Sequence, residues 1–132
     1  MIVAMGLGIN LGNTLEAPYE GNWAPPAQES FFDEYQAAVR CADSLIWELA
    51  MLAALKVHAQ GFTNVRIPVQ WDHHTATTPP YKINRTFLER VDEVVDWSLK
   101  RGMITVINTH HENWLDNPVT FEAQLPRLVA IW

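Results

Sequence analysis

Cysteine, long apolar runs and clusters of basic residues are nearly missing from this chain of 132 residues. Cys41 is the single cysteine, so the sequence contains no disulfide framework and does not indicate a redox compartment. No stretch approaches the roughly 18 apolar residues that a membrane-spanning helix needs. The opening residues Met1–Met5 also lack the basic start and the full apolar stretch of a signal peptide.

Positive charge is scarce as well. The chain has 9 Lys and Arg against 15 Asp and Glu, a net charge of −6. An acidic chain without a basic run is not attracted to a phosphate backbone or to an anionic membrane surface. We therefore expect no nucleic acid and no membrane among its partners, while the oligomeric state stays open.

Three apolar segments are each followed directly by polar residues, and we expect each to form a strand. They cover residues 6–11, 61–69 and 103–109. Segments with helical spacing alternate with them, at residues 30–60, at 84–100 and from about 120 onward. This alternation predicts an α/β fold with a parallel sheet, either part of an eight-fold barrel or half of a doubly wound sheet.

The richest polar segment, His110–Trp114, follows the third predicted strand and holds two histidines, a carboxylate, an amide and an indole. Ligands of α/β folds bind beyond the carboxyl ends of such strands, so this position suits a polar ligand of sugar size. Trp23, Trp71 and Trp114 also lie in polar, loop-like surroundings, where an indole face commonly stacks on a ligand. The alternative for each is packing in the core.

Three motifs, each at the end of a predicted strand, together resemble glycoside hydrolase family 5, the cellulase-like enzymes built on a (β/α)8 barrel. They are Asn10-Leu-Gly-Asn13-Thr-Leu-Glu16, Val65-Arg66-Ile-Pro68-Val-Gln-Trp71 and Asn108-Thr-His110-His111-Glu-Asn-Trp114. The resemblance implies a partial TIM barrel of about three βα units, extracellular location, no cofactor and a polysaccharide or oligosaccharide substrate. It also implies retaining hydrolysis of β-linked glycans by two carboxyl groups.

The same resemblance assigns roles to individual residues. Arg66 matches an arginine that keeps the nucleophilic carboxylate ionised, and His110 matches a histidine that lines the catalytic subsite. The resemblance further suggests Asn13 and Trp71 as substrate-binding side chains, and His111 beside His110 is a third candidate. Trp114 is a fourth candidate because of its polar, loop-like context. The alternative, purely structural roles are an ion pair for Arg66, a turn-forming role for Asn13 and loop packing for Trp71.

The family places its nucleophile and its acid/base after the fourth and seventh strands. This chain reaches only the third unit, so we expect it to be the N-terminal part of a barrel domain and to be inactive by itself. Glu16 and Glu112 receive no catalytic role from the resemblance. Because side chains alternate along a strand, we also expect that His110 and His111 do not both face one ligand.

Residues 39–60 do not fit the family pattern. Without them, Tyr35–Ala38 would run directly into Gly61–Arg66, as the family resemblance requires. With them, a helix from Ser30 to Gln60 is expected, well beyond the usual 10–14 residues. We consider two hypotheses: a retained intron or gene-model error, and a genuine helical insert that mediates self-association.

The sequence also permits two other functions. A metal-dependent hydrolase would need several ligands at the barrel mouth, and adjacent histidines are poorly spaced for chelation. Its candidate ligands are His73, His74, His110, His111 and Glu112. The other function is non-catalytic carbohydrate binding through Trp71, Trp114 and the polar strand ends.

Overall fold

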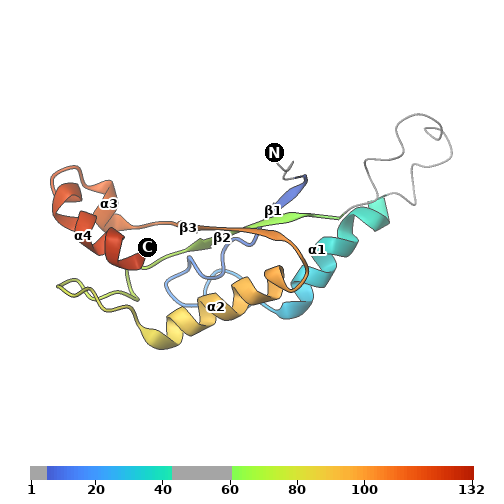
Figure 1. The fold of residues 1–132 in the computed structure, drawn as a ribbon, viewed down its shortest axis with the longest axis horizontal. Helices are drawn as coiled ribbons and strands as arrows, with labels where there is room; N and C mark the ends of the chain where they lie inside the picture. The colour runs from blue at the N-terminus through green and yellow to red at the C-terminus, as the bar shows by residue number, and fades with distance from the viewer. Residues whose placement is uncertain (1–5, 43–60) are drawn as a thin grey trace.

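The computed structural model describes residues 6–42 and 61–132, and within them it contains a parallel sheet of three strands (Figure 1). The strands are β1 (Gly8–Asn10), β2 (Asn64–Val69) and β3 (Ile104–Thr109), in the order β1-β2-β3. Both pairings are parallel, as predicted. All three carboxyl ends therefore lie at one edge of the sheet, beside the loops that follow the strands.

Two long helices cover one face of the sheet. Helix α1 (Glu29–Ala42) follows β1 and helix α2 (Arg85–Leu99) follows β2, and both lie below the strands in Figure 1. Two further helices, α3 (Asn113–Asp116) and α4 (Phe121–Ile131), lie at the carboxyl ends of the strands. The expected helix from Ser30 is confirmed as far as Ala42, and the rest of the segment assigned to it lies outside the described residues.

Helix α2 begins and ends where its sequence indicates. The side chain of Asn84 accepts a hydrogen bond from the backbone N–H of Phe87, which satisfies one of the N–H groups that a helix start leaves without an internal partner. Gly102 follows the helix with φ 69°, a left-handed conformation that costs glycine nothing. The chain then turns directly into β3, so this short connection sets the position of the third strand.

The core lies between the sheet and the two long helices. Val65, Ile67 and Val69 of β2 are completely buried there, together with Phe32 of α1 and Val94 of α2. Burial of each such side chain stabilises the fold by about 1.5–3 kcal/mol. Successive side chains alternate across a strand, so the residues between Val65, Ile67 and Val69 face the other side of the sheet.

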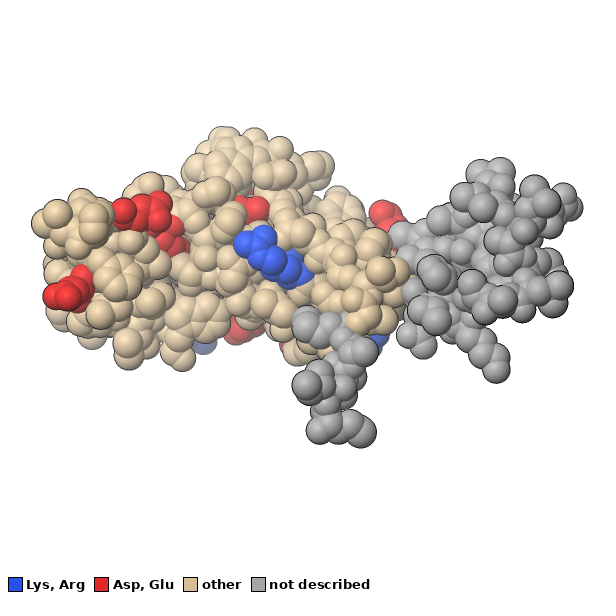
Figure 2. Space-filling view, turned by 90° about the horizontal axis from the view of Figure 1, so that it is seen from above, with Lys and Arg blue, Asp and Glu red and all other residues tan. Residues whose placement is uncertain are grey.

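That other face has no helix over it among the described residues. Ile104 and Val106 of β3 are each 39% exposed on it, and Arg66 of β2 is half-buried. Figure 2 looks onto the molecule from this side and shows a surface that is mostly uncharged, with a basic group near its middle and several acidic groups around it. In a complete (β/α)8 barrel this face would be the inner one, because the helices lie outside. No helix in the described part of the chain is long and apolar enough to cross a bilayer.

Candidate functional site

Arg66 joins the three strands just below their carboxyl ends. Its Nη1 donates to Oδ1 of Asn10 in β1 over 2.6 Å, and its Nη2 lies 3.4 Å from Nδ1 of His110, which follows β3. A guanidinium has no acceptor, so Nδ1 of His110 must accept in this contact. The neutral imidazole then carries its proton on Nε2, which leaves an N–H donor for another group.

The charge state of His110 agrees with this arrangement. Burial lowers the pKa of its imidazole, and the neighbouring His111 and Arg66 lower that pKa further. Glu16 acts in the opposite direction but does not outweigh these effects. His110 is therefore a neutral hydrogen-bond donor around neutral pH, which suits contact with a sugar hydroxyl or with a carboxylate.

His111 lies beside His110, contrary to the expected alternation. The two ring centroids are 4.1 Å apart at an interplanar angle of 56°. The reason is backbone conformation: β3 ends at Thr109, and His111 has φ 58°, so the strand rule no longer applies. The carbonyl of His111 accepts from Nε2 of Gln70 over 2.8 Å, which ties this turn to the end of β2.

Asn13 occupies the turn after β1 with φ 64°, a conformation that asparagine tolerates better than most residues. Its backbone N–H and that of Thr14 both donate to the carboxylate of Glu16, which is 4% exposed. Glu16 thus orders the turn and holds the exposed Asn13 side chain at the edge of the site. Asn13 lies in a turn, as its alternative role predicted, but the side-chain hydrogen bonds that order this turn are accepted by Glu16. Contact of Asn13 with a substrate stays a prediction.

Trp71 and Trp114 are interior residues, with exposures of 3% and 9%. The ring of Trp71 packs edge-on against Phe87 at 5.6 Å, and Nε1 of Trp114 donates to Glu112 over 2.8 Å. A sugar ring cannot reach these buried indole faces, so the stacking role suggested by their polar sequence context does not fit the structure. Polar neighbours in sequence gave the wrong indication because the loops fold back over the rings.

Glu112 is the centre of this buried framework. It is 3% exposed, and it accepts the backbone N–H of Trp71 over 2.5 Å as well as the indole N–H of Trp114. Burial raises the pKa of Glu112, partly offset by these two donors. The guanidinium of Arg127 lies 4.6 Å from the Trp114 ring centroid and donates to the carbonyl of Asp72. Sequence reasoning passed over Arg127, although an arginine among the apolar residues of α4 was a possible signal.

Trp23 is the tryptophan that remains accessible beside the histidines. Its side chain is 49% exposed, and its ring meets the ring of His111 edge-on at 5.8 Å and 86°. The sequence indicated a loop position for Trp23 but gave no reason to place it near His111. That proximity depends on a contact between the loops after β1 and β3.

The second histidine pair is His73-His74, and His74 contacts Phe87. The ring of His74 stacks on Phe87 at 3.6 Å and 8°, and burial lowers its pKa. Among residues 6–42 and 61–132, no group of three or more His, Cys, Asp or Glu side chains is arranged to hold a metal ion. The geometry of the described site therefore gives the metal-dependent alternative no ligand set.

A parallel sheet, helices on its outer face and polar side chains beyond the carboxyl ends of its strands define the class: a partial TIM barrel with its site at the usual end. The family model described as Cellulase (glycosyl hydrolase family 5) matches residues 48–126. The chain belongs to glycosyl hydrolase family 5.

Curated relatives and solved structures agree with this family. Endoglucanase H of Acetivibrio thermocellus is 45% identical over the whole chain, and Cellulase/esterase CelE of the same organism is 35% identical. The crystal structure of endoglucanase Cel5A from Thermotoga maritima is 40% identical and covers 97% of this chain with a TM-score of 0.74. The chain spans only 12% of Endoglucanase H, 14% of CelE and 34% of the Cel5A chain.

Proposed function

We propose that this chain is the N-terminal part of a retaining endoglucanase that hydrolyses β-linked glucans or mannans. The observation that carries the proposal is the Asn10–Arg66–His110 cluster at the carboxyl ends of three parallel strands. Relatives with solved structures support the substrate class, since Cel5A has been crystallised in complex with cellobiose and with mannotriose. A Bacillus licheniformis relative, 38% identical, has been crystallised with cellotetraose.

In the proposed reaction, one carboxylate attacks the anomeric carbon and a second carboxyl group protonates the leaving oxygen, about 5–5.5 Å away. Both groups would come from a later part of the protein. Arg66 would keep the nucleophile ionised, because a positive guanidinium close to a carboxyl group favours its charged form. His110 would donate its Nε2 proton in a hydrogen bond to the substrate or to the nucleophile.

The first experiment uses the purified 132-residue chain. We expect it to bind cellotetraose in the millimolar range or better, and to release no chromophore from a chromogenic cellobioside. Hydrolysis by the chain would contradict the assignment of the catalytic carboxyl groups to a later segment. Absence of any cello-oligosaccharide binding would contradict the substrate class.

The second experiment uses the protein translated from the complete reading frame that contains this chain. We expect it to hydrolyse carboxymethylcellulose, and His110→Ala to lower kcat roughly a hundredfold, as for loss of one preorganised donor. A complete protein that binds cellotetraose without turnover would favour the alternative, a non-catalytic carbohydrate-binding protein.

We also propose that the complete protein acts outside the cell, because β-linked polysaccharides are too large to enter one. The nucleotide sequence upstream of this chain is the direct check. A leader peptide in the frame would support export, and an in-frame start without one would contradict it.

A further inference from the structure

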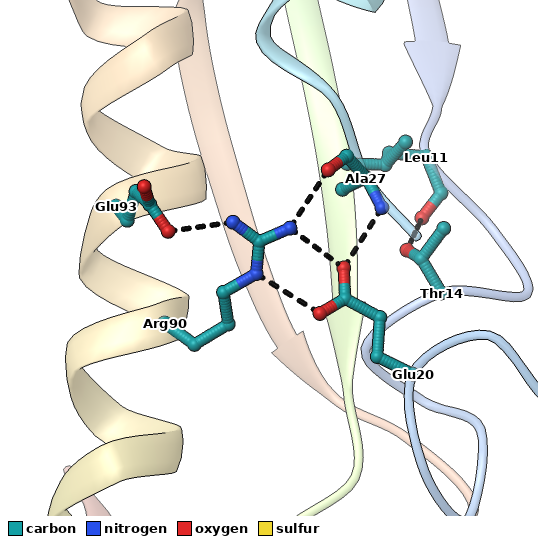
Figure 3. Close-up of polar contacts among 6 residues, drawn as sticks. All are labelled: Leu11, Thr14, Glu20, Ala27, Arg90 and Glu93. Atoms are coloured by element: carbon teal, nitrogen blue, oxygen red, sulfur yellow. Dashed lines mark hydrogen bonds and ion pairs between the residues drawn. The ribbon is translucent and has the colours of Figure 1, made fainter. Parts of the chain in front are cut away.

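The loop between β1 and α1 is closed at its base by one ion pair (Figure 3). Glu20 Oε1 accepts the backbone N–H of Ala27 over 2.8 Å, and Arg90 Nη2 donates to the carbonyl of the same residue over 2.7 Å. Arg90 also forms a two-pronged contact with the Glu20 carboxylate, through Nε and Nη2, both at 2.9 Å. We call these contacts of Glu20, Ala27 and Arg90 the loop clip.

The two side chains of the loop clip, Glu20 and Arg90, stay charged. Burial opposes ionisation of Glu20, but the hydrogen bonds from Arg90 and Ala27 outweigh it and leave the pKa of Glu20 lowered. Arg90 is held in turn by α2, where its Nη1 donates to Glu93 over 2.6 Å and its guanidinium lies over the Trp97 ring at 4.8 Å. The loop is thereby fixed to a rigid helix rather than only to itself.

Trp23 lies within the segment that the loop clip closes. Nearly half of its side chain is exposed while one part of its ring contacts His111. Tyr19, just before the clip, is 64% exposed, and its hydroxyl accepts a hydrogen bond from Asn22 over 3.0 Å. This loop therefore presents accessible aromatic surface directly beside the histidines of the site.

We propose that Trp23 is a sugar-stacking residue beside His111, and that the Glu20–Arg90 clip is the device that positions it. An indole offers a flat apolar face to the C–H groups of a pyranose ring and loses little side-chain freedom when it binds. Trp71 and Trp114 cannot do this because they are buried. The inference rests on the proposed function, since its ligand is a β-linked oligosaccharide.

Binding of cellotetraose to the full 132-residue chain tests the stacking role. We expect Trp23→Ala to weaken binding about five- to tenfold, the size of a lost aromatic contact. Trp132→Ala is the matched control: Trp132 is 64% exposed, but it donates to Thr109 on the helix-covered side of the sheet. We expect the dissociation constant of this control for cellotetraose to lie within about twofold of that of the unsubstituted chain.

The indole N–H signals in an NMR spectrum give a second readout that does not depend on affinity. The chain has six tryptophans, and the Trp23 signal is identified by its loss in Trp23→Ala. Cellotetraose should shift this signal more than those of the buried Trp71 and Trp114. An unmoved Trp23 signal in a chain that binds cellotetraose overturns the inference.

The loop clip is tested by Glu20→Gln, which removes the charge but contacts no ligand in the proposal. We expect weaker cellotetraose binding in the otherwise natural chain and no additional loss when Trp23 is already alanine, because the clip acts through Trp23. Equal losses in both backgrounds would overturn the positioning role. If Trp23→Ala binds cellotetraose as tightly as the natural chain, the role of Trp23 is wrong but the proposed function stands. If the natural chain binds no cello-oligosaccharide, both the proposed function and the role of Trp23 are wrong.

Discussion

The guanidinium of Arg66 lies 3.4 Å from Nδ1 of His110, although 44 positions separate the two residues in the sequence. The parallel register makes this possible, because Val69 pairs with Thr109 and the backbone N–H of His110 then donates to the carbonyl of Val69. A cation and an imidazole are thus held together by the sheet itself. As a consequence, the contact determines which ring nitrogen of His110 carries the proton, and it favours the neutral imidazole.

The first prediction concerns the pKa of His110. Burial, His111 and Arg66 all lower it, so Arg66→Gln should raise it toward the ordinary value of a histidine. The measurement is an NMR titration of the imidazole C–H signals. Arg85→Gln is the control, because the Arg85 side chain is 90% exposed on α2 and pairs there with Glu89. A His110 pKa that falls or stays constant in Arg66→Gln would contradict the assigned contact.

The second prediction is the pH dependence of stability. A histidine with a lowered pKa in the folded state binds its proton more readily when unfolded, so the unfolding free energy rises with pH between the folded and unfolded pKa values. His110 and His74 both act in this direction. We expect the contribution of these two histidines to the unfolding free energy to reach its full value above about pH 6.5 and to decrease as the pH falls below it. Urea unfolding between pH 5 and 7.5 checks this, and His110→Asn should flatten the slope.

The third prediction concerns Glu112. Its two carboxylate oxygens accept from the Trp71 backbone and the Trp114 indole, and a glutamine can offer only one oxygen to these donors. Glu112→Gln should therefore destabilise the chain by about 1–3 kcal/mol, the cost of one buried donor without a partner. Thermal unfolding measures this. The exposed Glu122 gives the control, and Glu122→Gln should change stability by less than about 0.5 kcal/mol.

The fourth prediction concerns Gly61. A Cβ at this position would collide with the backbone carbonyl of Gln36 in α1, because the two backbone segments touch. Gly61→Ala should destabilise the fold by about 1–3 kcal/mol through this overpacking. Glu34→Ala, an exposed change on the same helix, is the control for general effects on α1. Equal unfolding midpoints for the two variants would show that α1 and the segment just before β2 are not in contact.

The fifth prediction concerns residues 39–60, the segment that departs from the family pattern. Phe62 donates its backbone N–H to the carbonyl of Tyr35 over 3.2 Å, so the chain leaves and returns at nearly the same place. We expect a variant that lacks residues 39–60 to fold with the same sheet and to keep the Arg66–His110 contact. The His110 titration provides the measurement, and loss of the lowered pKa would contradict the prediction.

Sequencing of the spliced transcript distinguishes the two hypotheses for that segment. A shorter message without these codons supports a retained intron. A message that always contains them excludes that origin and leaves a genuine insert, whose proposed role in self-association is tested by sedimentation of the chain with and without it.

The sequence was sufficient for the three parallel strands and for α2, because apolar runs, an N-capping asparagine at residue 84 and a terminating glycine at residue 102 are local signals. It did not predict the short helix α3, which lies in the segment read as a polar loop. It also placed Arg66 and His110 near the ends of predicted strands, where the structure shows them in contact, and their roles in a site stay predictions. It failed for Trp71 and Trp114, because burial is decided by which loops fold over a side chain. The carboxylate that fixes both indoles, Glu112, is 41 positions away from Trp71.

The left-handed φ of His111 and the loop clip around Trp23 could not be predicted from the sequence either. Neither residue type demands these conformations locally, and both depend on contacts between separate loops. The alternation expected for His110 and His111 was wrong for that reason. Local patterns predicted where the chain runs, and long-range contacts decided which aromatic ring the solvent can reach.

The uncovered face of the sheet has a consequence for protein synthesis. Ile104 and Val106 are 39% exposed on it, and the ribosome delivers β1, β2 and β3 in that order. During translation this surface is a site for unwanted association with other nascent chains. An exposed apolar strand surface of this kind favours contact with other apolar surfaces for as long as it stays uncovered.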